Sequence, residues 1–395
     1  MSERAWGTYI CLAVALAPLA AFVPIPYTDV WYSAYIGLFA ALMLAVAVYL
    51  WPFNWLLSLL SGWALFSAIF VSQQHPKAML LIIQLNMALI AIRKISELSA
   101  VWRRRVLYAM LFVYYVQVVM ISLQSIGSDP VFNSLANPLQ DDTVGISGSK
   151  NQVGLFFAVT APMAVSFHPA LGLMNLLGVC LSKTTIAAAA FFISMSAYVF
   201  MHNKFLGIIA LTMLCVLIAV YLRYIDDFSE PKLRERKELI LSSVRDVERG
   251  YAKMRHGQAE MTVTTNRWLG FGLGNFMRVS PYTQYDFTTK HNLGVGQEAP
   301  HHVYEHAHND YVENWYELGR TGFIITLGLV LKFFTDFIKA YKTKILKVCF
   351  CAVLAHLICA LGIYTIQTAI SGLCLMVFYG LFMGEVRCAK RPIMG

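Results

Sequence analysis

The chain has 395 residues, of which 58% are hydrophobic and only 13% are charged. A soluble domain carries roughly a quarter charged residues, so this composition excludes an ordinary soluble protein and predicts an all-α polytopic membrane protein. The formal net charge of +9 does not indicate nucleic-acid binding, because the basic residues concentrate in short segments between apolar runs. That pattern orients membrane helices.

A helix needs about 20 apolar residues to cross the hydrocarbon core, and the sequence contains about twelve candidate segments of this kind. In chain order they are Ala5–Val23, Trp31–Leu50, Trp55–Val71, Ala78–Ile92, Val106–Ile126, Gln152–Phe167, Ala170–Leu181, Thr184–Met201, Phe205–Leu222, Gly322–Phe334, Val348–Tyr364 and Ala369–Val386. The first resembles a signal peptide, but the many spans after it favour an uncleaved first helix. Ala170–Leu181 and Gly322–Phe334 are short enough to be half-spans or re-entrant.

Basic residues assign the two sides of the membrane. With the N-terminus inside, the cytoplasmic side receives the basic loops Arg93–Arg105 and Lys339–Lys347, together with Lys204 and the tail that begins at Arg387. The same assignment leaves only isolated basic residues in the short outside loops. We therefore expect both termini in the cytoplasm.

This topology divides the chain into three parts. Residues 1–222 hold the first group of spans, residues 223–321 form one large loop outside the cytoplasm, and residues 322–395 hold the remaining spans and the tail. A loop of this length is usually functional. Within it, the apolar residues of Lys232–Arg255 recur at helical spacing, which predicts an amphipathic helix on the membrane surface or docked onto the bundle.

All eight cysteines lie in or beside apolar runs. Neither a disulfide framework nor a metal-binding spacing of cysteines is present. We expect these cysteines to act as small buried hydrophobic side chains.

Two arginines of the large loop, Arg255 and Arg267, precede alternating glycines at Gly270, Gly272 and Gly274. The run lacks the spacing of a dinucleotide-binding fingerprint and follows no clear strand. A tight turn is the expected role. Its backbone amides can also approach an anionic group, because glycine permits close contact.

Histidines crowd the end of the large loop, close to two acidic residues: His301, His302, Glu305, His306, His308 and Asp310. The set offers enough ligands for zinc, but its spacing matches no zinc motif, and we expect no metal. A loop of solvated histidines is one interpretation. We favour a single catalytic histidine, His308, because an imidazole titrates near neutral pH and can accept a proton from a sugar hydroxyl.

The residues after His308 predict a short helix that enters the membrane. Asn309 follows directly, and Asp310, Glu313 and Glu317 keep a three-to-four-residue spacing. On a helix, His308 and Glu317 lie on roughly the same side. Glycines at 319 and 322 then indicate a helix break or a close helix approach at the membrane boundary.

Two lysines lie at predicted helix starts on the outside face. Lys150-Asn151 begins one span and Lys183 begins another. A lysine there can meet a phosphate, assisted by the free amides of the helix N-terminus. The alternative is that each lysine extends to the membrane interface, as lysines commonly do.

Four segments together resemble the O-antigen ligase and polymerase superfamily of bacterial membrane glycosyltransferases. They are GISGSKNQVG, LSKTTIAAAA, Arg255 with the following RWLGFGLGNF, and HAHNDYVENWYELGRTG. The last is the most specific, since it is similar to the family's His-Asn…Glu-x-Gly-x-x-Gly signature. The resemblance covers the helical layout and is specific from about Gly145 to Gly322.

The resemblance implies a GT-C-like enzyme of the bacterial inner membrane that needs neither metal nor cofactor. Its donor would be a glycan on undecaprenyl pyrophosphate. The catalytic residues would be His308, Asn309 and Glu317, and the residues that bind the substrate pyrophosphate would be Arg255, Arg267, Lys183, Lys150 and Asn151. Thr185 stands where many relatives carry an arginine, and Lys183, two residues earlier, is turned by roughly 200° on a helix.

Several acceptors fit this donor chemistry. We favour lipid A–core, the acceptor of a ligase; a second lipid-linked glycan would make the protein a polymerase, and a protein acceptor would make it an O-oligosaccharyltransferase. A transporter or flippase would usually place ionisable residues inside its spans. Here His356 is the main residue of that kind, which favours an enzyme. Membrane lipids are the remaining expected partners, and nucleic acid is not expected.

Overall fold

The structure is a computed structural model that describes residues 8, 11, 46, 49–50, 53–72, 75–126, 150–182, 184–205, 268–276, 309–341, 343–362 and 369–390. Within these ranges the regular elements are helices: α3 (Trp55–Phe66), the π-helix η3 (Ser67–Val71), α4 (His75–Glu97), α5 (Ala100–Ser125), α6 (Lys150–Phe167), α7 (Ala170–Ser182), α8 (Thr185–His202), α12 (Asp310–Ala340), α13 (Lys344–Cys359) and α14 (Ala369–Lys390). Each corresponds to one of the apolar segments of the sequence. The predicted spans Ala5–Val23, Trp31–Leu50 and Phe205–Leu222 lie wholly or almost wholly outside the described residues, as does the amphipathic helix at Lys232–Arg255.

Among the described residues, four helices are long and apolar enough to cross a membrane: Lys77–Glu97, Ala100–Ser125, Asp310–Ala340 and Ser371–Lys390. Shorter apolar helices are Trp55–Val71, Asn151–Phe167, Ala170–Ser182 and Ile186–His202. These lengths and compositions are those of a polytopic membrane protein. The sequence-based count of about twelve spans is a prediction beyond this set.

Several helices extend past the bounds that hydropathy predicts, and α5 and α12 show why. The prediction begins the fifth span at Val106, whereas α5 begins at Ala100 and includes Arg103. It ends another span at Phe334, whereas α12 continues to Ala340 and includes Asp336. In both cases a charged side chain is held inside the helix by an ion pair, which the apolar pattern does not reveal.

The same observation corrects the placement of the basic residues. Arg93 and Lys94 lie in α4, and Arg103 lies in α5, so the connection between these helices is only Leu98-Ser99. Charged residues within terminal turns remain compatible with membrane helices, because long basic side chains reach the interface. The basic cluster therefore lies on helix ends and not in the short loop that the sequence predicts.

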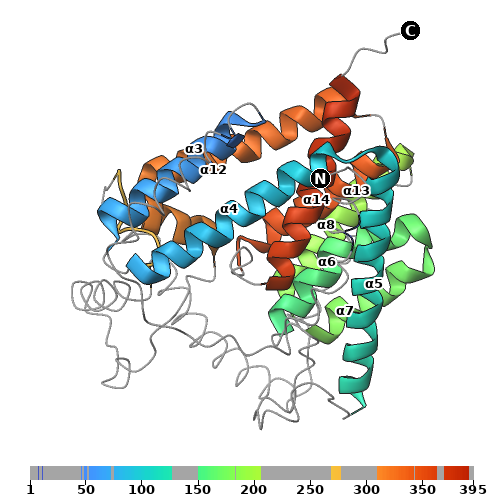
Figure 1. Ribbon diagram of the computed structural model, residues 1–395. Helices are drawn as coiled ribbons and strands as arrows, with labels where there is room; N and C mark the ends of the chain where they lie inside the picture. The colour runs from blue at the N-terminus through green and yellow to red at the C-terminus, as the bar shows by residue number, and fades with distance from the viewer. Residues whose placement is uncertain are drawn as a thin grey trace, which may run out of the picture.

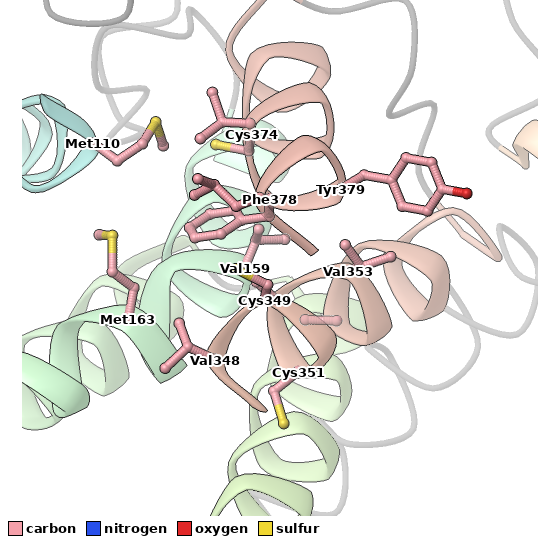
Figure 2. Packing of buried hydrophobic residues seen from close by; sticks show 14 of the residues in the cluster. Met110, Val159, Met163, Val348, Cys349, Cys351, Val353, Cys374, Phe378 and Tyr379 are labelled. Atoms are coloured by element: carbon pink, nitrogen blue, oxygen red, sulfur yellow. The ribbon is translucent and has the colours of Figure 1, made fainter. Parts of the chain in front are cut away.

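A core of interleaved helices positions the rest of the molecule. In Figure 1, α6, α8, α13 and α14 overlap in the centre, while α3 lies beside α12 and α4 crosses α14. Figure 2 shows part of this core, where Phe378 of α14 lies near Val159 of α6 and Cys349 of α13. Cys349, Cys351, Cys359 and Cys374 are all buried free thiols, as expected, whereas Cys180 and Cys388 are exposed.

Small residues permit the closest helix approaches. A Cβ on Gly178 of α7 would overlap with the ring of Phe157 in α6, and a Cβ on Gly154 would overlap with Ser182. Membrane helices commonly pack through such positions, because small residues let backbones approach. The packing brings the start of α6 against the junction between α7 and α8.

The two ends of the bundle differ in charge. At one end, Lys344 donates from Nζ to the carbonyl of Ser166 at 2.7 Å, and Lys347 donates to the carbonyl of Met201 at 2.8 Å. Lys390 pairs with Asp336 at 2.9 Å at the same end. The opposite end holds the starts of α6, α8 and α12 and the end of α13, and it carries the predicted site residues that the structure describes.

Candidate functional site

The start of α12 is fixed to the end of α13 by three hydrogen bonds. Asn309 donates from Nδ2 to the carbonyl of Leu361 at 3.0 Å, and the backbone amide of Asp310 donates to the carbonyl of Ala360, also at 3.0 Å. The Tyr311 hydroxyl donates to the carbonyl of Leu357 at 3.1 Å. The carbonyl of Leu357 in the last turn of α13, and those of Ala360 and Leu361 just beyond the helix, are therefore satisfied by the segment that follows His308.

The end of α13 in turn touches the start of α8. A Cβ on Gly362 would lie 3.4 Å from the side chain of Ile186. Two residues earlier, the hydroxyl of Thr184 donates to Oδ1 of Asn151 in the first turn of α6 at 3.1 Å. The structure thus brings together three segments that the sequence singles out, those following Lys150, Lys183 and His308.

Asn309 is the N-cap of α12. Its Oδ1 accepts hydrogen bonds from the backbone amides of Tyr311 at 3.0 Å and Val312 at 3.1 Å. Asparagine is among the preferred residues at this position, because its side chain satisfies amides that have no partner in the first turn. Both ends of the Asn309 amide group are engaged, so the backbone beside His308 is held from two directions.

The acidic residues after the cap form one buried face of α12. Asp310, Glu313 and Glu317 are exposed by only 9%, 4% and 4%, which confirms the predicted helical spacing. Buried carboxylates need charged or hydrogen-bonding partners. The partners of Glu317 come from residues 268–276, called here the glycine segment.

α12 breaks at Gly319, whose φ of 70° and ψ of −170° are not helical. The break frees carbonyl groups of the preceding turn, and other segments satisfy them. The amide of Phe271 donates to Tyr316 at 2.9 Å, the amide of Gly272 donates to Glu317 at 3.0 Å, and the indole of Trp63 donates to Leu318 at 2.9 Å. A break within apolar surroundings is tolerated because the freed backbone groups find these donors.

The glycine segment is the tight turn that the sequence predicts, with positive φ at Gly270, Gly272 and Gly274. The anionic group that its amides meet is the carboxylate of Glu317. The amide of Phe276 donates to Glu317 Oε1 at 3.0 Å, and the amide of Gly274 also binds this carboxylate. Successive amides turned inward in this way form an anion-binding concavity.

The other face of the glycine segment contacts residues that the sequence analysis did not select. Ser67 of η3 accepts from the amide of Leu273 at 3.0 Å, and Ser72 donates to the carbonyl of Leu273 at 2.8 Å. A Cβ on Gly272 would overlap with the backbone of Ser72. In the sequence, the signal that could have indicated these contacts is Ser72, the serine directly after an apolar run. A π-helix such as η3 frequently marks a functional site.

Several predicted site residues lie outside the described part of the chain: His308, Arg255, Arg267 and Lys183, and also the side chain of Lys150. The histidines at 301, 302 and 306 lie outside it as well. Among the described residues, no group of His, Cys, Asp and Glu is placed to hold a metal ion. Asn309, Asn151 and Glu317 are the predicted residues whose side chains are described.

A bundle of apolar helices, with paired basic residues at one end and a buried polar cluster at the other, defines an integral membrane protein with a site at one surface. Comparison with protein families refines this class, because residues 170–327 match the family described as O-antigen ligase. The match runs from the start of α7 into α12 and includes the glycine segment. This part of the chain is therefore similar to the O-antigen ligase family. A comparison with curated proteins finds no match.

Proposed function

We propose that the protein is a membrane glycosyltransferase of the ligase type. It moves an oligosaccharide or polysaccharide from undecaprenyl pyrophosphate to lipid A–core at the periplasmic face of the inner membrane. The observation that carries this proposal is the convergence of three helix starts, at Asn151, Thr184 and Asn309, on the end of the bundle opposite the basic cluster. Basic ends face the cytoplasm, so the convergence faces the compartment in which a lipid-linked glycan is transferred.

The proposed reaction assigns the base to His308. Its imidazole accepts the proton of the acceptor hydroxyl as that oxygen bonds to the anomeric carbon of the donor. The bond from this carbon to the pyrophosphate oxygen breaks, and the electron pair leaves with the pyrophosphate. Asn309 contributes by fixing the backbone next to His308, through its bonds to Tyr311, Val312 and Leu361.

Basic residues hold the leaving pyrophosphate in this proposal. Arg255 and Arg267 belong to the stretch that leads into the glycine segment, and Lys150 and Lys183 precede the two bonded residues Asn151 and Thr184. A guanidinium binds phosphate oxygens bidentately and stabilises the developing charge. Free amides at the starts of α6 and α8 add further donors.

The test uses purified protein in detergent with an undecaprenyl-pyrophosphate-linked glycan, with lipid A–core in one reaction and no added acceptor in the other. We expect product on lipid A–core that disappears in His308→Ala and persists after EDTA treatment. Longer lipid-linked chains without lipid A–core would identify a polymerase instead. Absence of both products with several donors would overturn the proposal and favour a protein acceptor or transport.

A further inference from the structure

The contacts of Glu317 point to a role that the resemblance does not supply. We infer that Glu317 is a positioning residue: its buried carboxylate fastens the glycine segment to the broken helix α12, and glycan transfer depends on this attachment. The inference rests on the proposed glycosyl transfer. It assigns Glu317 a function in holding the glycine segment, in place of a proton-transfer step.

Two sets of hydrogen bonds attach the glycine segment to α12. One set is accepted by backbone carbonyls and the other by the side chain of Glu317. Backbone amides of Phe271 and Gly272 donate to the carbonyls of Tyr316 and Glu317 at 2.9 and 3.0 Å. In addition, the amide of Phe276 donates to Glu317 Oε1 at 3.0 Å, with the amide of Gly274 on the same carboxylate. Glu317 therefore receives donors on its carbonyl and on its side chain from one short segment.

Glycine is required on both sides of this contact. A Cβ on Gly270 would overlap with Glu317 and Gly319, and a Cβ on Gly319 would overlap with Trp268 and Gly270. Their φ angles of 69° and 70° are also unfavourable for other residues. The two glycines pack back to back, so the segment and the helix break form one joint.

A carboxylate fits this joint better than a neutral side chain. An ionised carboxylate accepts only, and hydrogen bonds from amides to a charged acceptor are about twice as strong as neutral ones. The nearby carboxylate of Glu313 opposes a negative charge on Glu317, and Lys77 of α4 offsets part of that charge. With 4% of its surface exposed and amides on its oxygens, the carboxylate faces the protein interior.

The joint extends to the first residue of the glycine segment. Arg267 directly precedes Trp268, whose carbonyl accepts from the amide of Thr321 at 3.4 Å. On the other side, Ser67 and Ser72 hold Leu273, so the segment is clamped between η3 and α12.

The experiment compares Glu317→Ala, Glu317→Gln and Glu317→Asp in the full-length protein in detergent. Hydrogen exchange of the amides of residues 268–276 measures how firmly the glycine segment is held. Steady-state glycan transfer measures the effect of its release on activity. In Glu317→Ala we expect exchange at least about tenfold faster and kcat/KM for the donor lowered about 10- to 100-fold, mainly through KM, since small displacements of binding groups cost this much. Glu317→Gln retains one acceptor oxygen and is expected to lose less than about tenfold.

A matched control uses another buried carboxylate of the same helix, at its opposite end. Asp336, also 4% exposed, pairs with Lys332 and Lys390 at the basic end, so Asp336→Asn should leave exchange of the glycine segment unchanged. Two results would overturn the inference: unchanged exchange in Glu317→Ala, or a Glu317→Gln variant as inactive in kcat as Glu317→Ala while residues 268–276 stay protected. If the wild type transfers no glycan but exchange rises in Glu317→Ala, the joint stands and the proposed function fails.

Discussion

The hydroxyl of Thr184 donates to Oδ1 of Asn151 at 3.1 Å and so ties the first turn of α8 to the first turn of α6. Each residue directly follows a lysine that the sequence marks as a phosphate ligand, Lys183 and Lys150. A bond between the neighbours of two candidate ligands fixes the spacing of their backbones. Mutation of Thr184 tests whether this spacing matters for binding of the donor.

Thr184→Val removes the donor while keeping the shape of the side chain. The expected cost is about 1 kcal/mol in the free energy of unfolding, because a half-buried acceptor loses its hydrogen bond. We expect KM for the donor to rise about threefold to tenfold with a smaller change in kcat. Thr335→Val is the control, since Thr335 is exposed and its hydroxyl bonds only to the carbonyl of Lys332 in its own helix. Equal effects of the two variants on KM would contradict the prediction.

Two roles of Asn309 can be tested separately: its N-cap of α12 and its hydrogen bond to the carbonyl of Leu361 after α13. Asn309→Ala loses both and should destabilise the protein by about 1–2 kcal/mol, the usual cost of an N-cap. Asn309→Asp keeps the cap but sets an oxygen against the carbonyl of Leu361, so transfer should fall about tenfold or more with less loss of stability. Thermal unfolding and transfer rates are measured on the same preparations.

The N-cap at the other end of the bundle is the control. Thr343 caps α13 by accepting from the amide of Leu346 at 3.1 Å, far from the candidate site along that helix. Thr343→Ala should destabilise the protein while transfer by the folded fraction is retained. Loss of transfer in proportion to stability in both variants would show that Asn309 acts through folding alone.

The joint at Gly319 predicts a contrast between two glycines of α12. Gly319→Ala meets both a positive φ and an overlap with Trp268 and Gly270, so we expect destabilisation of about 1–3 kcal/mol or more. Gly328→Ala adds a methyl group at ordinary contact distance, 3.5 Å from Leu56. That change should be neutral or stabilising by up to about 1 kcal/mol. The melting temperatures of the two variants, measured in one detergent, test this contrast. Equal decreases in melting temperature would be evidence against the helix break at Gly319.

The basic end contains a buried ion pair whose removal should be costly. Arg103 donates from Nε to Glu385 Oε1 at 3.0 Å, with side chains only 4% and 7% exposed, and Thr343 donates to the second oxygen at 2.7 Å. Glu385→Ala leaves an uncompensated guanidinium and should cost about 3–5 kcal/mol. The more exposed pair of Arg93 and Glu97 supplies the comparison, since Glu97→Ala should cost less than about 1 kcal/mol. Similar losses in the two variants would be incompatible with this assignment.

The apolar runs predict the described helices well, because a membrane span requires an uninterrupted hydrophobic stretch. They misplace the start of α5 and the end of α12, since Arg103 and Asp336 are accommodated by partners far along the chain, Glu385 and Lys390. Hydropathy evaluates each residue by itself. A charged residue that is neutralised inside the fold is therefore mistaken for the end of a membrane span.

The candidate site, like the helices, is only partly predictable from the sequence. Its residue types and the tight turn at the glycines are readable from spacing, and an asparagine before an acidic helix start is a recognisable cap. The bond between Phe276 and Glu317 spans 41 positions, and that between Trp63 and Leu318 spans 255. No local pattern encodes contacts of this range, so the glycines indicate a turn without naming the carboxylate that the turn encloses.

The broken helix α12 also has a mechanical consequence. From Gly322 to Ala340 the helix is about 27 Å long, enough for most of the hydrocarbon core, whereas the turns before Gly319 are bonded to α13, Trp63 and the glycine segment. When bilayer thickness changes, a spanning helix responds by tilting. Gly319 lets the spanning part tilt by itself, so Asn309 keeps its place above membranes of different acyl-chain length.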